Sequence, residues 1–131
     1  NVNDRKPVWV VKKVEHAVAE LLKRERKSLD QLRIACLGLA FKPDIDDLRE
    51  SPSVEIVRVL YEKYGSSLIA VEPNIEELPG SLMSMPEITQ FKEAVLQADV
   101  LVILVKHRLF VEKLPQICRG KVVIDACGAL D

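Results

Sequence analysis

The sequence predicts a three-layer, Rossmann-like α/β sandwich with a mainly parallel sheet, preceded by a long N-terminal helix. Continuous apolar runs of strand length recur along the chain, as is typical of strands covered on both faces. Segments with helical apolar spacing lie between them, and this alternation favours a parallel sheet with right-handed crossovers. The chain has 131 residues, 48% of them hydrophobic and 30% charged, which suits one soluble domain with its own core.

The first half of the chain reads as helix, strand and helix. From Pro7 to about Arg26, apolar residues recur at three- and four-residue intervals, which predicts an amphipathic helix. The run Arg33–Leu39 is the first strand. A second helix follows, with Ser51 as its N-cap, Pro52 at its first position and Gly65 at its end.

The second half supplies the remaining strands. Ser67–Pro73 is the second strand, and the Pro- and Gly-containing segment Asn74–Pro86 is a loop. The stretch ITQFKEAVLQA then reads as a short edge piece followed by a helix. Asp99–Val105 and Lys121–Ala126 complete the predicted sheet.

The carboxyl ends of the predicted strands define where a ligand would bind. In open parallel sheets, ligands occupy the crevice at that edge. The loops expected there are Phe41–Arg49, Glu72–Ile75, Lys106–Phe110 and Ala126–Gly128.

Composition excludes several classes of protein. Nineteen Lys and Arg against twenty Asp and Glu give a formal charge of -1, without the basic excess of a nucleic-acid-binding domain. No apolar run is long enough to span a membrane. The three cysteines, Cys36, Cys118 and Cys127, form no CxxC pair. We therefore expect neither a metal site nor a disulfide framework. Such cysteine usage fits a protein of the reducing cytoplasm.

The loop after the first strand carries charge instead of glycine. A dinucleotide site of the Rossmann type needs GxGxxG, but here Gly38 stands alone, which argues against a self-sufficient NAD site. The loop offers cations on side chains. Lys42 can meet a phosphate or a sugar oxygen, and Arg49 offers a planar fork just before a predicted helix N-terminus.

These residues resemble a known family. GLAFKPDIDDLRESPSVEI closely resembles the signature that opens the C-terminal domain of UDP-glucose/GDP-mannose 6-dehydrogenases. The segments VEPNI and ADVLVILVKH are also similar to that family and lean toward its UDP-N-acetylmannosamine branch over the UDP-glucose branch. The resemblance covers essentially the whole chain.

The resemblance implies an oxidoreductase. Family members oxidise the C6 alcohol of a UDP-sugar to a carboxylate with two NAD+, here giving a UDP-aminouronic acid for surface polysaccharide. They have an N-terminal NAD-binding domain, a central dimerising helical region and a C-terminal domain that closes over the nucleotide-sugar, so the full-length protein is expected to be a homo-oligomer. Residues 1–30 would then lead from the central region, and residues 31–131 would form the UDP-sugar-binding domain.

The start of the sequence agrees with such a piece of a longer chain, because it has no initiator Met. The resemblance places the catalytic cysteine upstream of residue 1, so no residue here is assigned as catalytic, and NAD would be bound mainly by the N-terminal domain. The isolated chain is expected to be inactive.

Site residues carry over position by position. Phe41 and Lys42 match the family's Phe-Lys pair that contacts the UDP-sugar, and Arg49 matches an arginine that reaches NAD. UDP-glucose members have a substrate-binding arginine in a D-G-R pattern after the last strand, where this chain has DACG with Cys127. Two alternatives remain. One is the domain of a UDP-glucose or other UDP-hexose dehydrogenase, and the other is a non-catalytic Rossmann-like module for nucleotide binding or dimerisation.

Other candidates favour structural interpretations. Arg49 could instead pair with Asp46 or Asp47 and order the loop. The carboxylates of Asp44–Asp47 favour turn formation and capping over metal binding. Glu72 stands where a Rossmann domain places its ribose-binding acid, but without the glycine loop it reads as a strand-end residue. His107 follows a strand at the ligand edge without a nearby carboxylate in sequence, and is a weak acid–base candidate.

Overall fold

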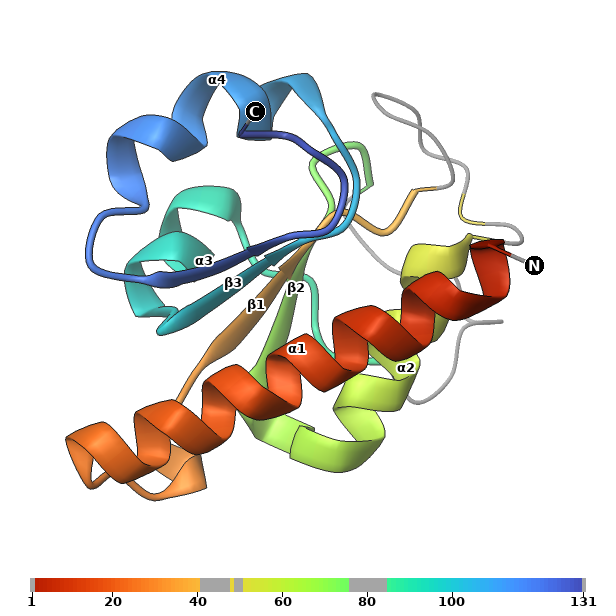
Figure 1. The fold of residues 1–131 in the computed structure, drawn as a ribbon. Helices are drawn as coiled ribbons and strands as arrows, with labels where there is room; N and C mark the ends of the chain where they lie inside the picture. The colour runs from red at the N-terminus through yellow and green to blue at the C-terminus, as the bar shows by residue number, and fades with distance from the viewer. Residues whose placement is uncertain (1, 41–47, 49–50, 76–84, 131) are drawn as a thin grey trace.

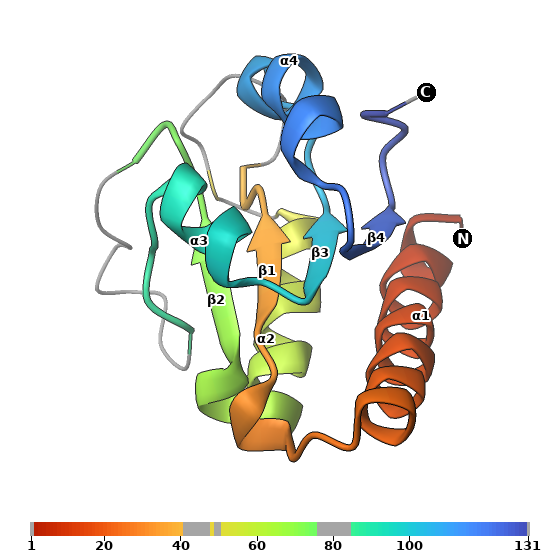
Figure 2. The same cartoon turned by 90° about the vertical axis from the view of Figure 1, so that its left-hand side faces the viewer.

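A computed structural model of the chain describes residues 2–40, 48, 51–75 and 85–130, with the backbone alone for residues 2–7. It contains a parallel sheet of four strands in the order β2-β1-β3-β4. The strands are β1 (Ile34–Leu37), β2 (Leu68–Val71), β3 (Val100–Ile103) and β4 (Val122–Asp125). Figure 2 shows all four arrows pointing the same way, so the predicted fold class is confirmed.

Helices cover both faces of the sheet (Figure 1). The long α1 (Val2–Glu25) and α2 (Pro52–Tyr64) lie side by side on one face, and α3 (Phe91–Gln97) and α4 (Arg108–Ile117) lie on the other. Short 3-10 turns, η1 (Leu29–Gln31) and η2 (Gly65–Ser67), lead into β1 and β2.

Strand side chains alternate between two cores because successive residues point to opposite faces. On the α1/α2 face, Ile34 and Cys36 of β1 pack with Val14 of α1 and Leu60 of α2. On the α3/α4 face, Leu37 packs among residues of α3 and α4 such as Val95, Phe110 and Leu114. Cys36 is fully buried, as expected of a cysteine used as a small hydrophobe.

Local signals place the ends of α2. The Ser51 side chain accepts a hydrogen bond from the Ser53 N–H at 3.2 Å, Pro52 opens the helix, and Gly65 ends it with φ 56°. Beyond β2, Ile88 forms an isolated parallel bridge with Ala70, which is the predicted edge piece before α3.

One prediction was wrong. The segment Lys106–Phe110 was expected to be loop, but α4 begins at Arg108 and continues through Pro115 to Ile117. Its apolar residues Phe110 and Leu114 are fully buried, which compensates for the backbone hydrogen bond that Pro115 removes. On the outer side of α1, Trp9 is 48% exposed, with the Lys13 ammonium 5.6 Å from its ring centroid.

Candidate functional site

The carboxyl ends of the strands gather polar groups at one edge of the sheet. Glu72 directly follows β2, His107 precedes α4, and Asp125 ends β4. The residues carried over from the family, Phe41, Lys42 and Arg49, belong to the segment that follows β1 and lie outside the described residues, as does Asp44–Asp47.

Glu72 makes hydrogen bonds to several segments at this edge. Its side chain is buried, and Oε1 accepts the backbone N–H groups of Leu39 at 2.9 Å and Ala40 at 3.0 Å. The same oxygen lies 2.9 Å from His107 Nε2. Oε2 accepts the backbone N–H of Asn74 at 3.1 Å and its side-chain amide at 3.3 Å. One carboxylate thus ties together the ends of β1, β2 and β3.

The electrostatics of Glu72 favour the ionised form. Burial by itself raises the pKa of this carboxyl, but the hydrogen bonds from His107, Leu39 and Asn74 outweigh burial and hold the pKa below its ordinary value. An ionised carboxylate only accepts hydrogen bonds. Nε2 of His107 therefore carries a hydrogen and is the donor in the hydrogen bond to Oε1.

His107 is held from several sides. Its side chain is 1% exposed, and it occupies the N-cap position of α4. The ring packs edge-on against Phe110, with centroids 5.4 Å apart. Sequence reasoning found no carboxylate partner for His107 because Glu72 lies 35 positions earlier in the chain. At this burial the imidazole cannot reach a substrate as a general acid or base.

Gly38 serves close packing. It has φ 101°, and an added Cβ would lie 2.6 Å from Cβ of Val105. Its N–H bonds to the Val71 carbonyl at 2.8 Å. Any side chain at this position would therefore collide with Val105. The positive φ and the close approach of Val105 explain why a glycine occupies this position.

Asp125 organises the turn after β4. Its carboxylate accepts the backbone N–H groups of Cys127 at 3.3 Å, Ala129 at 3.0 Å and Leu130 at 3.0 Å. Burial raises the pKa of Asp125, but these backbone hydrogen bonds, with one from Gly128, outweigh it and lower the pKa. The Sγ of Cys127 lies 3.7 Å from Asp125 Oδ1, so the thiol is part of this turn.

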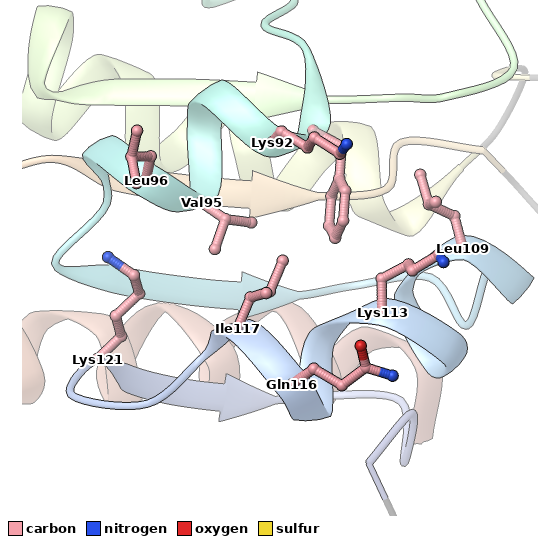
Figure 3. A pocket seen from close by; sticks show the side chains of 9 residues that line it. Lys92, Val95, Leu96, Leu109, Lys113, Gln116, Ile117 and Lys121 are labelled. Carbon is pink, nitrogen blue, oxygen red and sulfur yellow. The ribbon is translucent and has the colours of Figure 1, made fainter.

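Two cavities lie on the α3/α4 side. A polar one of about 250 Å³ adjoins Glu72 at the end of β2 and extends to Thr89, Gln90 and Leu109. A more apolar groove of about 510 Å³ runs between α3 and α4 (Figure 3). Its apolar side chains include Val95 and Ile117, and it also has the ammonium-bearing side chains of Lys92, Lys113 and Lys121.

Neither a metal cluster nor a membrane-spanning helix occurs in the described part of the chain. No group of three or more His, Cys, Asp or Glu side chains there could hold a metal ion. No helix among these residues is long and apolar enough to cross a bilayer.

Comparison with known proteins decides the family. Residues 35–131 match the UDP-binding domain of the UDP-glucose/GDP-mannose dehydrogenase family. The chain belongs to this family.

Individual relatives of this family domain agree with the sequence resemblance. The UDP-N-acetyl-D-mannosamine dehydrogenase of Yersinia pestis is 46% identical over 127 residues, which are 97% of this chain and 30% of that protein. The enzyme of the same name from Escherichia coli K12 is 49% identical over 109 residues, 83% of this chain and 26% of that protein. The chain thus spans less than a third of the length of these curated relatives.

Solved structures agree on the fold. An NDP-N-acetyl-D-galactosaminuronic acid dehydrogenase from Methanosarcina mazei superposes with a TM-score of 0.69 at 27% identity, covering 95% of this chain and 26% of that one. A UDP-N-acetyl-mannosamine dehydrogenase from Staphylococcus aureus superposes with a TM-score of 0.72 at 23% identity, over 94% of this chain and 27% of that one.

Proposed function

We propose that this chain is the UDP-sugar-binding domain of an NAD-dependent UDP-N-acetyl-D-mannosamine 6-dehydrogenase. The carrying observation is the 46% identity to the Yersinia pestis enzyme of that name across 97% of the chain. The parent enzyme would convert the C6 alcohol and one water into a carboxylate, while two NAD+ take up two hydrides. Residues 1–30 would connect to the central domain, and residues 31–131 would form the nucleotide-sugar domain, in accord with the family match from residue 35.

The part played by this domain is binding. Lys42 supplies a point charge for a phosphate or sugar oxygen, and Phe41 lies beside it in the family's motif. Arg49, which matches the arginine of the family motif, would contact NAD held by the N-terminal domain. The catalytic cysteine belongs to the rest of the parent enzyme, which is expected to be a cytoplasmic homo-oligomer.

The N-acetylated sugar is favoured over UDP-glucose. At the position of the arginine in the D-G-R pattern stands Cys127, an uncharged residue whose N–H is bound by Asp125. A side chain without a cation cannot reproduce a bidentate contact. The Methanosarcina mazei structure makes an N-acetylgalactosamine nucleotide the second candidate.

Steady-state kinetics of the full-length parent enzyme test the proposal. NADH formation is measured with UDP-N-acetylmannosamine, UDP-N-acetylgalactosamine and UDP-glucose, and we expect the highest kcat/KM with the first. Preference for UDP-glucose would refute the sugar assignment, and absence of turnover with every substrate would favour a non-catalytic module. The isolated 131-residue chain is expected to produce no NADH.

Two variants of the parent enzyme separate the roles of the cations. Lys42→Ala should raise the KM for the UDP-sugar roughly ten- to hundredfold, the loss expected for a charge-assisted hydrogen bond. Arg49→Ala should raise the KM for NAD with a smaller change for the sugar. Equal effects of both variants on both substrates would instead favour a role of Arg49 in ordering the loop through Asp46 or Asp47.

A further inference from the structure

The buried pair of Glu72 and His107 has no part in the function proposed so far. Both residues are almost completely buried, at 2% exposure for Glu72 and 1% for His107, so neither can touch a substrate. Their hydrogen bond joins Nε2 of His107 to Oε1 of Glu72 across 2.9 Å. A buried ionisable pair has to serve the protein through what it holds in place.

The pair holds the two residues that follow Gly38 at the end of β1. The Oε1 atom that faces His107 also accepts the N–H groups of Leu39 and Ala40. These two peptide groups directly precede Phe41 and Lys42 in the sequence. On the other side of the pair, the backbone N–H of His107 donates a hydrogen bond to the Val105 carbonyl at 2.9 Å. Val105 in turn packs against Gly38. Leu39 and Ala40, which follow β1, are therefore held between the ends of β2 and β3. We call the Glu72–His107 pair together with these two peptide groups the clamp.

The chemistry of the clamp requires both partners. A carboxylate placed beside buried peptide N–H groups satisfies them, and the His107 donor fixes the carboxylate in the orientation that does so. Without the imidazole N–H, Glu72 keeps its charge in a buried place with one donor fewer, so the carboxylate is held less firmly against the Leu39 and Ala40 N–H groups.

We infer that Glu72 and His107 are positioning residues for the nucleotide-sugar site: together they fix the Leu39 and Ala40 peptide groups, which directly precede the Phe41–Lys42 pair in the sequence. This inference deepens the proposed function and rests on it for the identity of the ligand. It assigns no proton transfer to His107. Loss of the pair weakens the binding of the nucleotide-sugar while the chemical step is preserved.

The decisive comparison is His107→Gln against His107→Leu in the full-length parent enzyme. Glutamine keeps an N–H donor for Glu72, whereas leucine fills similar space without one. We expect His107→Leu to raise the KM for the UDP-sugar about tenfold, as for loss of a hydrogen bond to a charged group, with kcat within about twofold. His107→Gln should restore KM to within about threefold of the wild-type value. Equal KM values for the two variants, or a fall in kcat at constant KM, would overturn the inference.

A structural control separates positioning from general destabilisation. Ile34 is fully buried at the opposite end of β1, so Ile34→Ala lowers stability without touching the clamp. It should lower the Tm at least as much as His107→Leu and leave KM unchanged. If Ile34→Ala raises KM equally, the effect of His107→Leu is one of stability and the inference fails.

Amide hydrogen exchange provides a readout that does not depend on the substrate. In the parent enzyme without ligand, Leu39 and Ala40 should exchange faster in His107→Leu and in Glu72→Gln, and at the wild-type rate in His107→Gln. Unchanged exchange in both of the first two variants would refute the clamp. If the wild-type enzyme oxidises no UDP-sugar, the proposed function fails, while this exchange pattern still decides whether the clamp exists.

Discussion

Single residues at the sheet edge have environments that determine their chemistry. Gly38 lies where any side chain would meet Val105, and Glu72 is saturated by protein donors. Cys36 lies in the core, where burial raises the pKa of its thiol to about 12. Each of these properties depends on neighbours that come from another strand.

Gly38→Ala should destabilise the chain by roughly 2–4 kcal/mol, since it combines a strained positive φ with overpacking against Val105. Gly120 provides the matched control, because it has φ 82° and no heavy atom within 4 Å of an added Cβ. Gly120→Ala therefore carries the backbone strain alone, and the smaller loss is expected in urea unfolding. Equal losses of unfolding free energy in the two variants would mean that the Val105 side chain shifts at little energetic cost.

Cys36 should resist alkylation in the folded protein. Thiolate is the reactive species, and a pKa of about 12 leaves almost none at neutral pH, in addition to complete burial. Iodoacetamide followed by peptide mass mapping should label the half-buried Cys118 and Cys127 first. Labelling of Cys36 at the same rate as theirs in native buffer would contradict the buried assignment.

At the scale of the element, the helices differ in how their ends are satisfied. Ser51 caps α2 with its side-chain oxygen, whereas Gln90 occupies the N-cap position of α3 without a side-chain hydrogen bond. An N-cap oxygen satisfies a backbone N–H that the helix itself leaves without a partner.

Substitution at these two caps should have opposite effects on stability. Ser51→Ala should cost about 1 kcal/mol, and Gln90→Ser should gain about 0.5–1 kcal/mol, because Gln90 is exposed and its backbone is already extended. Chemical unfolding of each variant measures both changes. A loss of stability in Gln90→Ser would show that the glutamine side chain makes a contact more valuable than a cap.

At the scale of the whole molecule, two carboxylates with several hydrogen bonds hold the strand ends in place. Glu72 joins β2 to β1 and β3, and Asp125 holds the turn after β4. The pKa of each is lowered because hydrogen bonds to the ionised form outweigh burial. Both groups therefore couple the stability of the molecule to pH.

The acid limb of the stability profile follows from the sign of these shifts. A carboxyl group with a lowered pKa in the folded state contributes stability that is complete above its unfolded-state pKa of about 4 and is lost as the pH falls through the folded value. We expect the free energy of unfolding to fall below about pH 4, and to fall less steeply in Glu72→Gln and Asp125→Asn. An acid limb as steep as that of the wild type in both variants would exclude these groups as its source.

Much of the fold could be predicted from the sequence because it is encoded locally. The apolar runs at β1, β2, β3 and β4 and the caps of α2 depend on neighbouring residues, and their positions were confirmed. The motif around Phe41 likewise identified the family without any structure. α4 was missed, although Phe110, Leu114 and Ile117 have helical spacing.

The sequence by itself determined the α/β class and the family, because apolar periodicity, capping residues and a contiguous motif are all properties of short segments. Only the tertiary structure decided the roles of Glu72, His107 and Gly38. Their partners lie on different strands, and the strand order β2-β1-β3 brings these strand ends together. Periodicity contains no information on that order, so the paired carboxylate and imidazole looked unrelated until the sheet placed them 2.9 Å apart.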